Sequence, residues 1–346
     1  MNPAVNGLFN LPIPSVRASS LSWLGVIQKT DQIKGDIYMK RFAWAMLLVL
    51  AFAVSGHAKD TKIRFGILPV LDTLPLQVAV HDGLFKVQGL DVELIKFASA
   101  LERDTAMQAG QLDGYFGDLI ATYMLIDKDV PMYVALISWR TTPGYPMFGI
   151  ANSPANKTKN IAQMRGSKLG LSKSTIMEFL ADKIAWKKGL SENYFDRVEI
   201  KKVPIRLQML MTDQLDAALL PEPLLTLARH KGGSVLTTAE DLRMPLTVLC
   251  LNRNYFNGGA DVYVRFITAY KEAVERLHSQ PEQYRKLMAE TCRIPGPLVS
   301  QFPIYPYPMP TLPEPKELDE VQDWMISKGL LSERIPHKLV LSPLIP

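Results

Sequence analysis

The chain has 346 residues, of which 47% are hydrophobic and 21% charged, and its formal net charge is +5 at pH 7. This balance excludes a disordered or fibrous chain and gives enough length for two hydrophobic cores. Only two cysteines are present, Cys250 and Cys292, which excludes a disulfide scaffold and leaves either one bond between them or two buried free thiols.

A cleaved secretory signal is predicted at Met39–Ala58. Two basic residues precede the apolar run Phe42–Val54, and small residues follow it. The run is shorter than the roughly 20 residues that span a bilayer, so an uncleaved membrane anchor is the weaker alternative. We therefore expect a mature, periplasmic chain that begins at Lys59, and we expect residues 1–38 to be a spurious or unstructured extension.

Removal of residues 1–58 would take away five basic and two acidic residues, so the net charge would fall from +5 to +2. A nearly neutral mature chain gives no support to nucleic-acid binding, which requires a strongly basic surface.

From Lys62 onward, short β-rich runs alternate with helical runs, which is typical of α/β units around a largely parallel sheet. Ser99 and Glu102 form a capping box that opens a helix, and Gly110 ends it. The first half of the pattern predicts strands at Ile63–Leu68, Asp91–Phe97, Tyr115–Gly117 and Met132–Ile137, and further helices from Pro75 to about Gly83 and over Leu119–Asp127.

The pattern restarts after a segment rich in Pro, Gly, Asn and Lys at residues 141–160. Thr175 and Glu178 form a second capping box, which opens a helix that ends at Lys188. The second half predicts strands at Pro146–Ala151, Lys168–Leu171, Val198–Val203, Leu215–Leu220 and Leu246–Leu251, and helices at Ile205–Thr212, Asp261–Ser279, Pro281–Thr291 and Lys316–Lys328.

One short internal echo supports two related halves. Gln111-Leu112-Asp113 precedes a short strand, and Gln214-Leu215-Asp216 does the same about a hundred residues later. Three matching residues are a weak signal by themselves.

Seven motifs follow one another along the two halves of the chain. In the first half they are Ile63–Pro69, Gly83–Lys86, Gly89–Glu93, Ser99–Asp104 and Gln108–Gly114. In the second half they are Gly166–Gly170 and Asp216–Pro223. In this order and spacing they resemble the nitrate/sulfonate/taurine/thiamine-pyrimidine group of ABC-importer binding proteins, and the similarity runs from Lys62 to Gly329.

The resemblance implies an α/β, two-lobed periplasmic-binding-protein type II fold with a ligand cleft and two hinge crossings, near residues 139–149 and 243–249. Lobe 1 would comprise residues 59–144 and 245–346, and lobe 2 residues 145–244. It further implies a solute receptor that works as a monomer with an ABC permease and ATPase, without a cofactor or metal.

Ligands of open α/β sheets bind outside the carboxyl ends of the strands, where helix N-termini offer free N–H groups. This rule selects Asp72, Thr73, Ser99, Asp118, Ser172, Lys173, Ser174 and Thr175 as candidate ligand-binding residues. The loop from Ser172 to Thr175 combines three hydroxyls, an ammonium and a helix start, which suits an anion. Plain helix capping is the alternative for Ser99, Asp118 and Thr175.

The hinge region supplies the remaining candidates: Trp139, Arg140, Tyr145 and Glu222. The rings of Trp139 and Tyr145 can stack on a ligand ring. Arg140 can pair with an anion, and Glu222 can accept a hydrogen bond from an amine. Hinge packing or a bond between the lobes is the alternative for each. The ligand class stays open between a small organic anion such as a sulfonate, taurine or nitrate, which we favour, and a thiamine-precursor pyrimidine or similar amino-bearing heterocycle.

No catalytic residues are predicted, because the sequence lacks the usual zinc, nucleophile-elbow and phosphate-loop motifs and shows no Cys-His pairing. Thiamine-pyrimidine and menaquinone-pathway enzymes of similar fold are alternatives. The first carries a cysteine-rich motif that this chain lacks, and the second would be cytoplasmic, which the leader opposes. A sensory or structural extracellular domain is a third alternative. Such a domain would normally show a transmembrane tether or a partner module, and the sequence gives no sign of either after residue 59.

Overall fold

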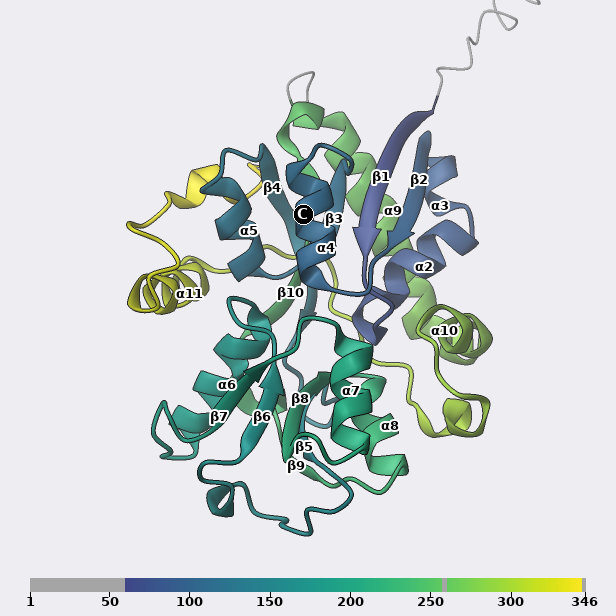
Figure 1. Ribbon diagram of the computed structural model, residues 1–346. Coiled ribbons are helices and arrows are strands. Elements are labelled where there is room, and N and C mark those ends of the chain that lie inside the picture. Colours follow the sequence, from purple (N-terminus) through teal and green to yellow (C-terminus); the bar gives the residue numbers. More distant parts are fainter. Residues whose placement is uncertain (1–59, 257–259, 344–346) are drawn as a thin grey trace, which may run out of the picture. The chain divides into compact units, whose positions relative to one another are not determined.

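The computed structural model describes residues 60–256 and 260–343, and these residues build two five-stranded sheets (Figure 1). The strand order is β2-β1-β3-β10-β4 in the first sheet and β7-β6-β8-β5-β9 in the second. The predicted signal Met39–Ala58 and the extension 1–38 lie outside the described residues. No helix within the described residues is long and apolar enough to cross a membrane.

The first sheet is mostly parallel: β1 pairs parallel with β2 and β3, whereas β10 runs antiparallel to β3 and β4. Its strands are β1 (Thr61–Ile67), β2 (Leu90–Lys96), β3 (Gly114–Gly117), β4 (Met132–Arg140) and β10 (Pro245–Asn252). The flanking helices are α2 (Leu74–His81), α3 (Leu84–Val87), α4 (Ala100–Gln108), α5 (Leu119–Ile126) and α9 (Asp261–Ser279).

The second sheet repeats this plan. β6 pairs parallel with β7 and β8, and β5 runs antiparallel to β8 and β9. Its strands are β5 (Phe148–Asn152), β6 (Lys168–Leu171), β7 (Asp196–Glu199), β8 (Ala217–Pro221) and β9 (Val235–Thr238). Its helices are α6 (Ile176–Lys187), α7 (Val203–Met211) and α8 (Leu224–His230).

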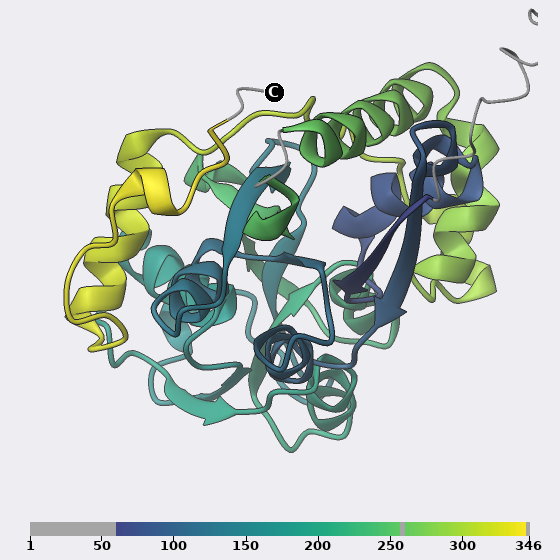
Figure 2. The ribbon, with the colours of Figure 1, turned by 90° about the horizontal axis from the view of Figure 1, so that it is seen from above.

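The remaining helices belong to the C-terminal part of the chain. They are α10 (Arg285–Thr291) and α11 (Pro315–Ser327), and Figure 2 shows them on opposite sides of the first sheet. Short 3-10 helices cover Leu71–Thr73, Ile161–Gln163, Glu240–Leu242, Arg253–Phe256, Pro281–Tyr284, Gly296–Gln301 and His337–Leu339.

The internal echo marks the same turn in both sheets. Asp113 Oδ2 accepts a hydrogen bond from the Arg64 backbone N–H at 2.8 Å, and Asp216 Oδ2 accepts one from the Lys168 N–H at 2.8 Å. In each case the aspartate that precedes a short strand binds the backbone of the neighbouring strand, at Arg64 in the middle of β1 and at Lys168, the first residue of β6. The shared residues therefore have a structural cause.

Two predicted elements are wrong in their extent. The strand expected over Val198–Val203 ends at Glu199, and Val203 instead begins α7. Proline is favoured in a first helical turn, so Pro204 draws its neighbour into the helix. The helix expected over Pro281–Thr291 is divided into a 3-10 turn and α10.

The predicted capping boxes form only in part. Thr175 caps α6 by accepting from the Met177 N–H at 3.2 Å, but Glu178 accepts from the Ser174 N–H at 2.7 Å, one residue before the cap. At the start of α4 the Ser99 hydroxyl accepts a hydrogen bond from the Glu102 N–H. The Glu102 carboxylate accepts one from the N–H of Ala98, the residue before the cap. Both glutamates thus support the entering loop rather than the cap residue.

Cys250 and Cys292 are both buried, and both are free thiols in this structure. Cys250 lies in β10, whereas Cys292 follows α10 and donates to the Val70 carbonyl at 3.4 Å.

Candidate ligand-binding site

A cleft of about 250 Å³ lies at the carboxyl ends of strands from both sheets. Residues that follow or end these strands line it, and they are Leu68, Phe97, Asp118, Ser172, Lys201 and Pro221. This is the position at which open α/β sheets bind ligands, because the loops and helix N-termini converge there. The cleft is therefore the candidate ligand-binding site.

Most of the cleft wall is apolar. Val70 and Phe116 contribute from the side of the first sheet, and Phe148, Met177 and Val203 contribute from the side of the second. All five are buried. Ligand sites typically combine such walls with a few well-placed polar groups, so the polar groups decide which chemistry is recognised.

Asp72 is the most unusual polar group of the cleft. It lies in the 3-10 turn after β1, its exposed fraction is 0%, and neither carboxylate oxygen has a hydrogen-bond partner among the described residues. Burial raises the pKa of Asp72 to about 7, and the Thr247 hydroxyl opposes this rise only in part. Thr247 reaches the same cleft from β10, and its hydroxyl lies close enough to the carboxylate to affect this pKa without meeting hydrogen-bond geometry, so neither group has a regular partner among the described residues.

Asp118 is a second buried carboxylate in the cleft, but it is engaged. It caps α5 by accepting from the Ala121 N–H at 2.9 Å. Burial raises the pKa of Asp118. Three groups lower it in part: the backbone amides of Ala121 and of Ile176 at the start of α6, and the positive charge of Arg103. The N-terminus of α6 therefore already faces a carboxylate of the chain itself.

Two buried arginines make equivalent contacts in the two sheets, although Arg103 lines the cleft and Arg206 does not. Arg103 Nη1 donates to the Phe116 carbonyl at 2.7 Å, and Arg206 Nη1 donates to the Leu219 carbonyl at 2.9 Å. Arg103 also pairs with Asp104 at 2.6 Å. Arg206 has carbonyl and hydroxyl partners but no carboxylate partner within the described residues, and burial lowers its pKa to about 9.

Arg206 supports the predicted anion loop from below. Its Nη2 donates to the Ser172 hydroxyl, and that hydroxyl lies 3.3 Å from the Ile200 carbonyl, to which it donates. Thr175 donates to the Ser172 carbonyl at 2.8 Å besides capping α6. The hydroxyls of this loop are therefore largely used within the protein.

The same loop separates the cleft from a second hollow of about 270 Å³. Ala100, Ser172, Thr175 and Lys201 line both spaces. Lys173 and Ser174 line only the second hollow. Of the predicted site residues, the structure thus places Asp72, Asp118, Ser172 and Thr175 at the cleft and Lys173 and Ser174 beside it.

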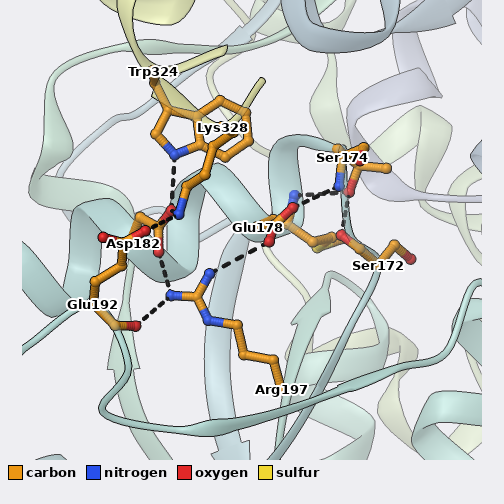
Figure 3. A network of polar contacts seen from close by, with 10 residues as sticks. Ser172, Ser174, Glu178, Asp182, Glu192, Arg197, Trp324 and Lys328 are labelled. Carbon is orange, nitrogen blue, oxygen red and sulfur yellow. Dashed lines mark hydrogen bonds and ion pairs between the residues drawn. The ribbon is translucent and has the colours of Figure 1, made fainter. Parts of the chain in front are cut away.

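A polar network holds this loop in place (Figure 3). Glu178 accepts from the Ser174 N–H and lies 3.5 Å from Arg197 Nη1. Arg197 also pairs with Asp182, and Asp182 accepts from Trp324 Nε1 at 2.8 Å. The loop is thereby connected through α6 to α11.

The other predicted residues lie outside both linings. Thr73 donates to the Val70 carbonyl at 2.8 Å, and Ser99 caps α4. Arg140 pairs with Glu317 near the start of α11. Their side chains thus have local structural partners.

Trp139 lies near the end of β4, Tyr145 lies between β4 and β5, and Glu222 directly follows β8. Trp139 packs against Tyr305 with ring centroids 5.4 Å apart, and Tyr145 packs against the same ring at 5.4 Å. Glu222 accepts from the Thr226 hydroxyl at 2.8 Å, burial raises its pKa to about 7, and its carbonyl accepts from the Leu71 N–H at 3.3 Å.

Sequence reasoning missed Arg103, Arg206, Thr247 and Cys292. The first two stand inside helices and the third inside a strand, where nothing local shows that the side chain reaches the cleft region. Only a comparison of the two halves, in which each arginine stands 13 residues before the carbonyl that it binds, would have suggested the first pair.

The chain shares its fold with known binding proteins. It is similar to the periplasmic aliphatic sulphonate binding protein of Escherichia coli, with a TM-score of 0.67, 18% identity, and coverage of 82% of this chain and 93% of that one. A desulfurization enzyme has the same fold, with a TM-score of 0.60, 14% identity, and coverage of 82% and 96%. The two-lobed α/β periplasmic-binding-protein fold is therefore present, and by itself it does not distinguish a receptor from an enzyme.

Sequence comparison gives a further relative, a Brachyspira hyodysenteriae protein whose name assigns it provisionally as an ABC transporter periplasmic binding protein. It is 21% identical over 241 residues, which cover 66% of this chain and 68% of the relative. The model of the family described as "NMT1/THI5 like" matches residues 71–284, a segment that contains Asp72, Arg206 and Thr247. The chain belongs to the NMT1/THI5-like family.

Proposed function

We propose that this chain is the solute-binding component of an ABC importer, which captures a small molecule in the cleft and delivers it to a membrane permease. The observation that carries the proposal is the cleft itself, which residues from both sheets line at the carboxyl ends of their strands. The names of the Brachyspira and Escherichia relatives support it. In this proposal the receptor is monomeric and periplasmic.

The proposed ligand is a small organic anion with an apolar part. Lys96, Lys201 and Arg293 are exposed side chains at the rim of the cleft and would attract an anion. The apolar walls would cover the rest of the molecule. Nitrate alone would leave those walls without a partner, so an organic sulfonate or carboxylate fits the cleft better.

An enzymatic role is the weaker candidate, although a desulfurization enzyme shares the fold. Cys292 is the one cysteine in the lining of the cleft, and burial raises its pKa to about 12. At neutral pH its sulfur is therefore a neutral thiol, which is a poor nucleophile. This chemistry supports binding without turnover.

A thermal-shift screen of the chain from Lys59 tests the proposal. Alkanesulfonates, taurine, nitrate, carboxylates and aminopyrimidines form the panel, and a compound at 100 times its Kd adds about 2.7 kcal/mol of stability. Mass spectrometry of each compound after incubation checks for turnover. Conversion of a panel member by the wild-type chain would contradict the receptor function, and so would the absence of any stabilising compound at millimolar concentration.

A further inference from the structure

Asp72 is an unpaired acid that faces a ligand cleft. Its side chain is fully buried, it lines the cleft, and both carboxylate oxygens lack a hydrogen-bond partner. Its backbone is held firmly, because the Ser138 hydroxyl donates to the Asp72 carbonyl at 2.8 Å. The carboxylate is therefore fixed in position without being satisfied there.

The groups around Asp72 do not supply the missing partner. Cys292, Tyr270 and Tyr307 are close enough to interact with it electrostatically. The Cys292 thiol donates to the Val70 carbonyl and the Tyr307 hydroxyl to the Leu71 carbonyl, and the Tyr270 hydroxyl forms no hydrogen bond with the carboxylate. Within the described residues, no lysine, arginine or histidine forms an ion pair with Asp72. Burying a carboxylate without partners is costly, and proteins normally pair such groups.

Comparison with the other buried acids shows that Asp72 is an exception. Asp118 is satisfied by the Ala121 amide, and Glu222 by the amide and hydroxyl of Thr226. Among the described residues, Asp72 is the buried acid whose two side-chain oxygens both lack a partner. The nearby Thr247 hydroxyl is also without a partner and can donate or accept.

We infer that Asp72, with Thr247 beside it, is the subsite for a ligand group that donates two N–H bonds, namely an ammonium or an amidine-like group. The inference rests on the proposed function and adds to it the class of ligand. The full ligand then carries an N–H donor group at Asp72, apolar atoms along the cleft wall, and any anionic group at the basic rim. Nitrate and amine-free sulfonates lack the donor and are poor ligands.

Matched pairs of compounds test this inference. Each pair differs only in the amino group: ethanesulfonate and 2-aminoethanesulfonate, acetate and glycine, pyrimidine and 4-aminopyrimidine. Calorimetric titration of the wild-type chain is expected to give the amino member of every binding pair a Kd that is tenfold to a hundredfold lower, as for charge-assisted hydrogen bonds. Asp72→Asn, which is nearly isosteric, should remove this preference.

Glu222→Gln is the matched control, because it changes another buried carboxylate that already has protein partners and that lies outside the lining of the cleft. It should keep the preference for the amino member. Equal binding of both members by the wild type would overturn the inference, and so would a preference that survives in Asp72→Asn. In either case the receptor function would stand. If no member of any pair binds at millimolar concentration, the proposed function fails and the inference fails with it.

Discussion

The indole Nε1 of Trp324 donates a hydrogen bond of 2.8 Å to Asp182 Oδ2, and this bond joins α11 to α6. Lys328, one turn further along, pairs with the same carboxylate at 2.9 Å, and Arg197 pairs with it from β7 (Figure 3). The exposed fraction of the Asp182 side chain is 13%, so solvent screens these contacts only weakly. Asp182 thus binds residues of β7, of α11 and of the position just after α11, and it connects α11 to α6, the helix that begins at the cleft.

We expect Asp182→Asn to lower the free energy of unfolding by about 1–3 kcal/mol, because two cations lose a partly buried partner. Urea unfolding measures the effect. Asp319→Asn is the control, since its carboxylate also binds an arginine but is 40% exposed, and we expect a change below about 1 kcal/mol. Equal losses in the two variants would contradict a special role for Asp182.

Arg206 is expected to be essential for the local structure of the second sheet. Arg206→Met would remove the guanidinium donor from the Leu219 carbonyl and the Ser172 hydroxyl, and it would leave the Ile200 carbonyl with the Ser172 hydroxyl as its side-chain donor. Unsatisfied buried acceptors cost about 1–3 kcal/mol each, so a total loss of roughly 2–4 kcal/mol is expected after relaxation. Arg165→Met, at an exposed position, serves as the control. A variant as stable as the wild type would show that water replaces the guanidinium without cost.

Stability of the ligand-free chain should fall as pH rises from about 4.5 to 7. Asp72 and Glu222 have pKa values of about 7 in the folded chain, well above the ordinary values of 3.8 and 4.5. The folded state therefore holds these protons more tightly than the unfolded state, so ionisation between the two values favours unfolding. At pH 7 both groups are about half ionised in the folded chain, and the effect is complete about one pH unit higher.

Thermal unfolding of the wild type and Asp72→Asn between pH 4.5 and 8 measures this dependence. The variant has no acid at residue 72, so its melting temperature should fall less over the same range. Below pH 4.5 the lowered pKa values of Asp82, Asp113 and Asp182 act in the opposite direction. Identical profiles for the two proteins would show that Asp72 is ionised at low pH and has a partner in solution.

Two substitutions in the loop before α6 separate helix capping from ligand binding. Thr175→Ala removes the cap of α6 and should cost about 0.5–2 kcal/mol of stability. Lys173→Met leaves the cap intact and tests the proposed role of Lys173 toward the ligand. Lys173 lines the neighbouring hollow rather than the cleft. We therefore expect the Kd of the Lys173→Met variant for its ligand to stay within about threefold of the wild-type value in calorimetry. A tenfold or larger increase would mean that the ligand extends into the second hollow.

Much of the fold could be predicted because local patterns determine it. The capping residues Ser99 and Thr175 stand at the beginnings of α4 and α6, where the sequence predicted them. The short elements α3, α8 and β9 were not predicted, because four to seven residues carry little periodicity and their stability depends on packing.

The candidate site could be predicted only in outline. Asp72 and Asp118 were selected because they follow strands, a rule that depends on topology alone. The sequence could not show that one of these acids is satisfied and the other is not, since their partners are backbone amides and distant side chains. Thr247 illustrates the limit, because it reaches the cleft from a strand 175 residues after Asp72 in the chain.

We expect a small solute to bind in the cleft that residues of both sheets line. Calorimetric titration of the most stabilising compound of the panel into the wild-type chain and into Ala100→Trp tests it most directly. Ala100 is partly exposed in the first turn of α4 and lines the cleft, so an indole there would occupy part of its volume. We predict one site per wild-type chain and a loss of affinity of at least a hundredfold in the folded variant. Unchanged affinity in Ala100→Trp, with its circular dichroism spectrum equal to that of the wild type, would contradict the account.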